Sequence, residues 1–254
     1  MATTASLPAS TILRTVWDDL GELSVRLRSQ SIIACASAAF FALIGGIPAI
    51  SDNRTLAEVF DLMGTLVLVP FEIAIYRLLI SGEAASGYRF DISGARFRRM
   101  LGWTAGFWLL GNIPLYLPGA VASSDGAKVI ISVGLFALLI FVVLRLAIFL
   151  AAIAVGAPDA SVRNVFADTR GHTWLIAKAY FITLLPFLLM VISIVGLASL
   201  GGAHDVRSGI GSVAADVFSG LVGFLIWTCS VIVSARLFMK IGDRVKTGGP
   251  EASE

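Results

Sequence analysis

Six long apolar segments divide this chain, and they constrain its fold more than any other feature of the sequence. Each is long enough for the roughly 20 residues that an α-helix needs to cross a bilayer. Lipid offers no hydrogen-bond partners to backbone amides, so a spanning segment must be a helix or part of a closed barrel. These segments lack the alternation of barrel strands. We therefore expect six transmembrane helices, near residues 31–50, 56–81, 100–121, 128–156, 174–200 and 211–241.

The composition of the chain excludes a soluble globular domain. Apolar residues make up 57% of the 254 residues and charged residues only 14%, whereas soluble domains carry about 25% charged residues. Cys35 and Cys229 lie far apart in apolar segments, so we expect two small core residues and no disulfide, metal or cofactor site. Arginine outnumbers lysine, and alanine and glycine are abundant, which favours a GC-rich bacterial genome.

The two ends of the chain differ from the apolar middle. We predict that residues 1–10 and 243–254 are disordered and that residues 11–242 form one membrane domain. Between residues 12 and 28, apolar residues recur every three or four positions with charged residues between them, which is typical of an amphipathic helix. Because this segment leads directly into a span, an interfacial helix is favoured over a soluble cap helix.

Positive charges are unequally distributed between the two sets of loops. The set that includes both termini carries twelve arginines and lysines, whereas the opposite set carries three: Arg54, Lys128 and Arg207. Arginine and lysine accumulate in cytoplasmic loops. We therefore predict a multi-pass protein of the bacterial inner membrane with both termini in the cytoplasm.

The spacing of arginines and prolines indicates an internal repeat. Arg98 precedes Pro114 by sixteen residues, and Arg170 precedes Pro186 by the same number. Once a short gap is allowed, an arginine followed by leucine also recurs near the ends of the even-numbered segments, at Arg77, Arg145 and Arg236. A basic amphipathic segment precedes each odd-numbered one. Self-similarity of this kind is a signature of repeat architectures, so we expect an all-α fold of three repeated helical hairpins with cytoplasmic interfacial helices.

The most specific motif in the chain is Thr-Arg-Gly-x-x-Trp, formed by Thr169, Arg170, Gly171 and Trp174. Together with the Arg-Leu pair at Arg145 and the turn at Ala154–Gly156, it resembles the six-span bacterial inner-membrane proteins of the YciC type. These are similar to the membrane domain fused to some glycerophosphodiester phosphodiesterases. The resemblance covers roughly residues 20–245 and implies a six-helix membrane fold without an assigned activity. No segment corresponds to the phosphodiesterase domain, so none of its catalytic residues is carried over.

Two charged residues lie deep within predicted spans. Glu72 and Arg145 are about ten and eleven residues before the cytoplasmic ends of their spans, which places both roughly 15 Å deep at ~1.5 Å per residue. A charge near the bilayer centre costs at least ~2.5 kcal/mol and should face a partner inside the bundle. We hypothesise that Glu72 and Arg145 pair across the second and fourth helices. The pair would either lock the bundle or serve an ion, proton or substrate pathway, unless one charge instead extends to the interface.

Other basic residues are predicted to lie at the level of the lipid headgroups. Arg77, Arg236 and Lys240 can extend their long stems to headgroup phosphates. Cations at the membrane surface contribute about 1 kcal/mol each when they meet anionic lipid. The candidates for such contacts, in the basic segments before the third and fifth spans, are Arg96, Arg98, Arg99 and Arg170. This position beside the membrane makes nucleic acid an unexpected partner.

Motifs typical of enzymes are missing from the sequence. It contains no HExxH, no GxSxG and no glycine-rich phosphate loop, and its two histidines, His172 and His204, are predicted on opposite sides of the membrane. We predict a non-enzymatic structural or interaction protein of the bacterial envelope, whose partners are the lipid bilayer and other membrane proteins. The alternative is a transporter or channel for a small molecule or lipid, which a water-filled cavity around Glu72 and Arg145 would favour.

Overall fold

A computed structural model describes residues 9–84, 87–200 and 210–247 of the chain. Every regular element in these ranges is a helix, which confirms the all-α prediction. Residues 1–8 and 248–254, which we predicted to be disordered, lie outside the described residues, as do His204 and Arg207. The tail from residue 243 differs from our prediction, because it begins with a short helix in which Val245 is fully buried.

The helices follow one another with short connections. In chain order they are α1 (Ala9–Arg26), α2 (Arg28–Gly45), α3 (Pro48–Ser51), α4 (Arg54–Val67), α5 (Val69–Tyr76), the π-helical turn η1 (Arg77–Ser81), α6 (Ala95–Val121), α7 (Asp125–Arg145), α8 (Phe149–Val155), α9 (Val162–Asp168), α10 (Thr173–Leu200), α11 (Ile210–Ile241) and α12 (Asp243–Thr247).

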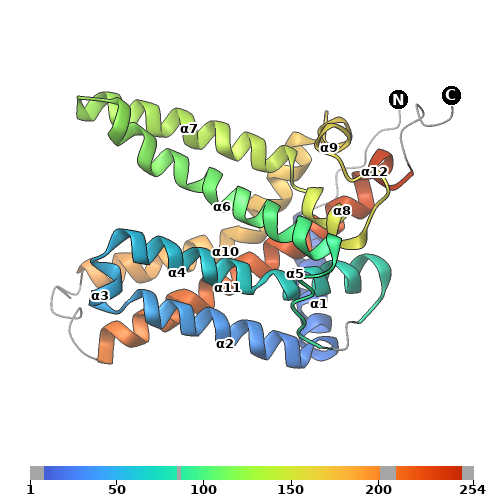
Figure 1. Cartoon of the computed structure of the whole chain (residues 1–254), viewed down its shortest axis with the longest axis horizontal. Helices are drawn as coiled ribbons and strands as arrows, with labels where there is room; N and C mark the ends of the chain where they lie inside the picture. Colours follow the sequence, from blue (N-terminus) through green and yellow to red (C-terminus); the bar gives the residue numbers. More distant parts are fainter. Residues whose placement is uncertain (1–8, 85–86, 201–209, 248–254) are drawn as a thin grey trace.

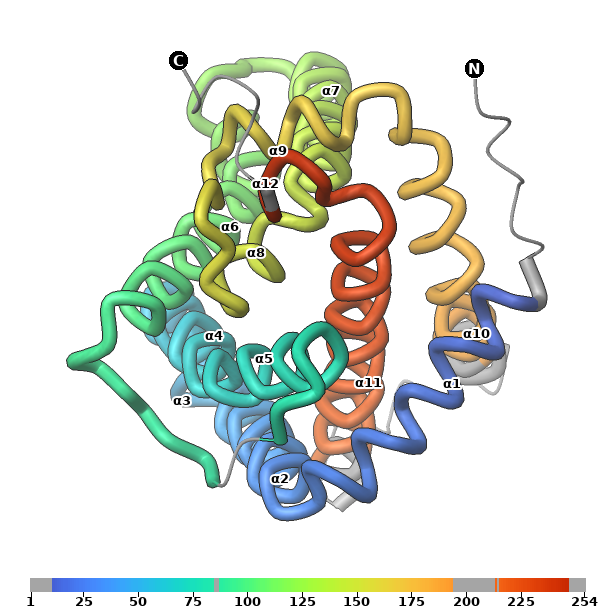
Figure 2. Tube along the Cα trace, turned by 90° about the vertical axis from the view of Figure 1, so that its right-hand side faces the viewer, coloured from blue at the N-terminus to red at the C-terminus, as the bar shows by residue number. Residues whose placement is uncertain are grey.

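The long helices run side by side along the longest dimension of the molecule (Figure 1). In the end-on view, α1 crosses one end of this bundle, and the short helices α8, α9 and α12 lie at the same end (Figure 2). Helix α1 contacts α2, α10 and α11. The predicted amphipathic helix is thus present, and its position at the membrane interface stays a prediction.

Five helical segments in the described residues are long and apolar enough to cross a membrane: Arg28–Gly45, Arg54–Ser81, Asp125–Val155, Thr173–Ser193 and Ala215–Ile241. The third predicted span coincides with α6, which has 27 residues but is not among the five. Glycines, Asn112 and two prolines dilute the apolar residues of α6. The five segments indicate a membrane protein, and the sixth span stays a prediction.

The three predicted hairpins are not equivalent in the structure. The second span is interrupted at Leu68, between α4 and α5, and the fourth between α7 and α8, whereas α11 is continuous. Consequently Arg77 begins a π-helical turn, Arg145 ends α7, and Arg236 lies inside an uninterrupted helix. The segment before the third span forms no separate interfacial helix, because α6 starts at Ala95 and continues into the apolar segment. The internal repeat is therefore not confirmed.

Burial is concentrated at the end of the bundle that α1 crosses. Helices α5 and α8 are almost completely buried there, with Phe71 and Phe149 each 1% exposed. In contrast, α6 and α7 present large apolar side chains on their outer surfaces, including Leu115, Ile130 and Val133, which are at least 60% exposed. Apolar surface of this extent is rare on soluble monomers and is compatible with contact with lipid.

Helices α2 and α11 approach each other closely at Gly220. A Cβ atom added to Gly220 would lie 2.5 Å from the Cβ of Ala42 and 3.2 Å from the carbonyl oxygen of Ala38. Small residues permit such close packing of membrane helices. The contact matters for the fold because it holds the first span against the last.

We expect Gly220→Ala to separate α2 from α11 and to lower the free energy of unfolding by about 1–3 kcal/mol, as overpacking usually does. Gly223→Ala, one turn further along α11, is the matched control because an added Cβ there meets no atom within 4 Å. Tryptophan fluorescence during thermal unfolding in detergent would measure both. Equal midpoints for the two variants would contradict the close contact.

Candidate functional site

Glu72 belongs to a buried polar cluster formed by three helices. Glu72 and Tyr76 lie four residues apart on one face of α5 and are 3% and 2% exposed. The hydroxyl of Tyr76 is the hydrogen-bond partner of the Glu72 carboxylate and also bonds with Ser234 of α11. The Ser234 hydroxyl in turn lies 2.6 Å from the hydroxyl of Tyr180 on α10. A carboxylate, a serine and two tyrosines thus form one hydrogen-bonded chain inside the bundle.

The predicted pair between Glu72 and Arg145 is not formed. Arg145 ends α7, which packs mainly on α6, and its guanidinium carbon lies 5.9 Å and 5.3 Å from the ring centres of Phe141 and Phe166. Its Nε atom is buried without a hydrogen-bond partner. In the described part of the chain, no ion pair joins either residue to an opposite charge. The cause is the break after Arg145, which leaves its side chain among aromatic rings, while Glu72 faces α10 and α11.

Arg236 forms an ion pair with Asp19 instead of extending only to headgroups as predicted. Its Nε donates to Oδ2 of Asp19 at 2.7 Å, and Nη2 donates a second bond to Oδ1. The Asp19 side chain is only 5% exposed, whereas that of Arg236 is 42% exposed. This two-bonded pair fastens α1 to α11. Trp17 reinforces the attachment by stacking on Phe187 of α10, with ring centres 6.1 Å apart.

The sequence carries a signal for the burial of Asp19. Asp19 follows Val16 by three residues and precedes Leu23 by four. All three therefore share the apolar face of α1, and all three are buried. An acidic residue on the apolar face of an amphipathic helix predicts a basic partner from the surface below. Which arginine supplies that charge could not be read from a spacing of 217 residues.

The start of the Thr-Arg-Gly-x-x-Trp motif and the preceding Asp168 connect three helices by hydrogen bonds. The carboxylate of Asp168, just before the motif, accepts hydrogen bonds from the backbone amides of Arg244 and Val245, both at 3.2 Å, at the start of α12. The fully buried Thr169 donates its hydroxyl to the carbonyl oxygen of Arg145 at 3.0 Å. These bonds tie α9 to α7 and α12.

The remaining motif residues turn the chain into the fifth span. Gly171, two residues before α10, has φ = 83°, a left-handed conformation that favours glycine. Arg170 is exposed, and Trp174 is 80% exposed at the first turn of α10. An exposed tryptophan at the end of a span is typical of the membrane interface.

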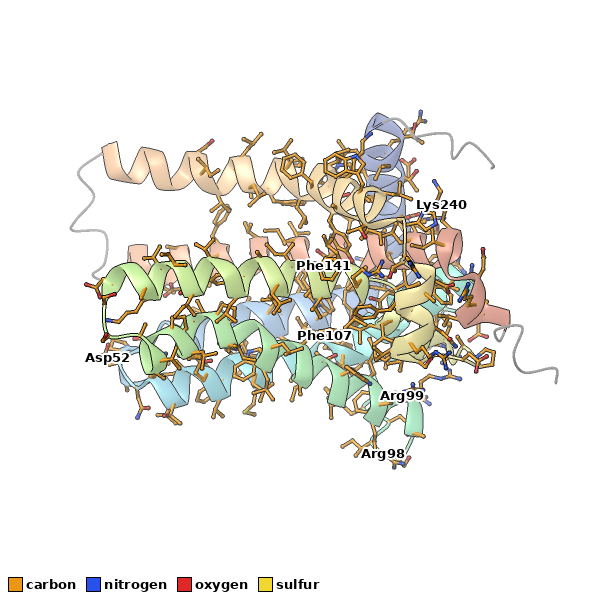
Figure 3. The ribbon with its side chains drawn as sticks, turned by 90° about the horizontal axis from the view of Figure 1, so that it is seen from above. Asp52, Arg98, Arg99, Phe107, Phe141 and Lys240 are labelled. Carbon is orange, nitrogen blue, oxygen red and sulfur yellow. The ribbon has the colours of Figure 1, made fainter. Side chains whose placement is uncertain are left out.

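The predicted headgroup residues gather at one end of the molecule. Figure 3 shows Arg98, Arg99 and Lys240 at the end opposite Asp52. Several of these side chains are also used within the protein: Arg98 donates to the Ser93 carbonyl at 2.9 Å, and Arg99 donates to the Ala160 carbonyl. Positively charged side chains are therefore concentrated at the end that α1 crosses. Some of them bind other elements of the protein, and others face outward.

We expect Asp19→Asn to loosen α1, because it removes the charge that Arg236 binds. Hydrogen bonds to charged groups contribute about 1.5–3 kcal/mol, and the exposure of Arg236 favours the lower end of this range. Asp18→Asn is the control, because the Asp18 side chain is 72% exposed and its contact with Arg14 is long, at 3.7 Å. Limited proteolysis within α1 should accelerate in Asp19→Asn alone. Equal cleavage of both variants and the parent protein would show that the pair does not hold α1.

Comparisons with known proteins identify no relative: no family model, no curated protein and no solved structure matches the chain. The resemblance of Thr169, Arg170, Gly171 and Trp174 to proteins of the YciC type stays a prediction.

Proposed function

We propose that this chain is a six-span protein of the bacterial inner membrane with a non-enzymatic structural or interaction role. Its working surface is the cytoplasmic end, which binds anionic lipid headgroups and membrane-protein partners. The observation that carries this proposal is the assembly of α1, α9 and α12 on one basic end of the bundle. Asp19 attaches α1 to the bundle and Asp168 attaches α12 to α9, which provides a rigid surface beside the membrane.

With six spans, the basic segments of the chain lie on one side of the membrane, which five spans would not allow. Helix α6 runs beside α7 and α4 (Figure 1), and its 27 residues correspond to about 40 Å at ~1.5 Å per residue, more than a bilayer core requires. With α6 as a span, α1, the start of α6, α9 and α12 share one side of the membrane. That side is the one with twelve basic residues against three, and the positive-inside rule makes it cytoplasmic.

Transport is the second candidate function, and Glu72 is the residue that favours it. Ionisable residues within spans often belong to proton or ion pathways, and the hydrogen-bonded chain from Glu72 to Tyr180 has the chemistry of a relay. Against this, the Glu72 side chain is buried and bonded to a tyrosine hydroxyl, as a residue that locks the bundle would be.

Water access to position 72 separates these two functions. In a cysteine-free background, we expect Glu72→Cys to stay unlabelled by a membrane-impermeant thiol reagent, because its surroundings are closed. Ser93→Cys, on an exposed loop, is the positive control in permeabilised membranes. Labelling at position 72 would refute a closed interior and favour transport.

The lipid interaction is tested by stability in nanodiscs of different charge. Each surface cation contributes about 1 kcal/mol in anionic lipid, so phosphatidylglycerol should raise the unfolding temperature above that in phosphatidylcholine. We expect Arg170→Gln to shrink this difference and salt to screen it. Lys128→Gln is the control at the opposite end, where Asp125 already binds the Lys128 ammonium at 2.9 Å. Equal losses in the two variants would contradict a basic end specialised for headgroups.

A further inference from the structure

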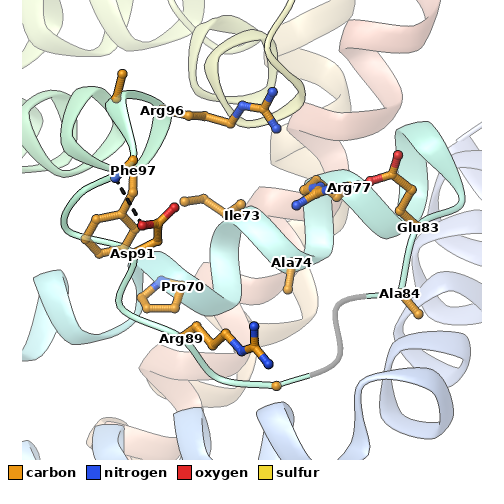
Figure 4. Close-up of a pocket in the computed structure, with 13 residues that line it drawn as sticks. Pro70, Ile73, Ala74, Arg77, Glu83, Ala84, Arg89, Asp91, Arg96 and Phe97 are labelled. Carbon is orange, nitrogen blue, oxygen red and sulfur yellow. Dashed lines mark hydrogen bonds and ion pairs between the residues drawn. The ribbon is translucent and has the colours of Figure 1, made fainter.

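A cleft of about 790 Å³ opens at the basic end between α5 with η1 and the start of α6 (Figure 4). Its apolar wall includes Pro70, Ile73 and Phe97. Three arginines from three different elements line it: Arg77 from η1, Arg89 from the loop before α6, and Arg96 from the first turn of α6. Guanidinium groups that converge on one cavity from separate elements are typical of an anion-binding site.

Two of these guanidinium groups are free to bind a ligand. Arg77 is occupied, since it donates two hydrogen bonds to the Glu83 carboxylate, one of them from Nε at 3.1 Å. Among the described residues, Arg89 and Arg96 form no side-chain hydrogen bond or ion pair, and both are exposed. Each offers five N–H donors in a planar arrangement that matches the oxygens of a phosphate.

The neighbouring elements hold both arginines in place. The Arg96 guanidinium packs against Gly156, where an added Cβ atom would lie 2.5 Å from Nη2. Beside Arg89, the Tyr88 hydroxyl donates to the Val67 carbonyl at the break between α4 and α5. Burial raises the pKa of the Tyr88 hydroxyl to about 12. The loop that carries Arg89 is thereby attached to the bundle.

The start of α6 adds a second, independent feature that favours an anion. This helix has 27 residues, and its N-cap residue Gly94 provides no side-chain cap. The backbone amides of its first turn lack intrahelical partners and carry the positive end of the helix dipole, and residues 94–97 all line the cleft. Such termini bind phosphate groups.

The two acidic residues of the cleft are each bound by a neighbouring group. Glu83 binds Arg77. The Asp91 carboxylate accepts hydrogen bonds from the Gly94 amide at 3.0 Å and the Ser93 hydroxyl at 2.8 Å. Both carboxylates therefore have partners of their own. With three arginines and two carboxylates, the cleft carries a net positive charge of one, which attracts the negative phosphate group of a monoester.

We propose that this cleft binds a phosphate monoester, with Arg96 and Arg89 supplying positive charge from its two edges (Figure 4) and the first turn of α6 donating backbone hydrogen bonds. The proposal gives the cytoplasmic end of the proposed function a defined site. The phosphate belongs either to a lipid headgroup that enters beside Ile73 and Phe97 or to a soluble phosphate ester. Glu83 limits the affinity, because it keeps Arg77 away from the ligand.

Binding to the purified full-length protein tests the proposal in two arms. In neutral detergent, glycerol phosphate is titrated by calorimetry; in phosphatidylcholine nanodiscs, retention of added phosphatidic acid is measured by native mass spectrometry. Each charge-assisted bond contributes about 1.5–3 kcal/mol, so Arg89→Gln and Arg96→Gln should each weaken binding roughly tenfold or more. Glu83→Gln should strengthen it by freeing Arg77. Lys128→Gln removes a positive charge at the opposite end of the molecule, where Asp125 binds it, and should leave binding unchanged.

The outcomes distinguish a soluble phosphate ester from a lipid headgroup. They also distinguish failure of the cleft from failure of the general preference for anionic lipid. Tight binding of glycerol phosphate in detergent identifies a soluble ester, whereas retention of phosphatidic acid alone identifies a lipid. The site is refuted if neither binds, or if the Arg89 and Arg96 variants, shown to be folded by unchanged melting without ligand, bind as the parent does. The general preference for anionic lipid depends on Arg170 and is measured without phosphate monoesters, so it can hold or fail independently.

Discussion

The hydrocarbon core of a membrane cannot hydrogen-bond, and this constraint governs both the helices of this protein and the polar contacts between them. A polar group that enters the bundle is therefore costly unless it finds a partner in the protein. The Asp19 carboxylate binds Arg236, that of Asp168 binds the start of α12, and that of Glu72 binds Tyr76. Because the first two bonds join elements distant in sequence, they also determine how the short helices are placed at one end.

Segment length and apolar periodicity were sufficient to predict the helical class and most of the spans, because they depend on residues close in sequence. The amphipathic pattern likewise predicted the helix α1, which the structure places across the end of the bundle. The partners of the buried charged residues could not be predicted in this way. Arg145 and Glu72 were plausible partners by their predicted depth alone. Because α7 ends at Arg145 and α5 is a separate short helix, the two side chains face different neighbours. Such local irregularities depend on tertiary packing rather than on apolar periodicity.

The candidate functional features share the basic end of the molecule. Sequence spacing identified Arg96 as a headgroup residue, but only the fold brings it together with Arg89 and the first turn of α6 in one cleft. The interior cluster around Glu72 is separate in character, since it is buried and internally hydrogen-bonded. The proposed role at the membrane surface is based on this contrast between the two sites.

The basic residues share one cytoplasmic face only if α6 crosses the membrane. Single cysteines at Ser93 and Ala122, on either side of α6, can be placed in a variant with Cys35→Ala and Cys229→Ala and exposed to an impermeant thiol reagent. Six spans predict that position 122 reacts in cells whose inner membrane is sealed, while position 93 reacts only after permeabilisation. Labelling of both positions from the same side would show that α6 does not cross the membrane and would contradict the proposed arrangement.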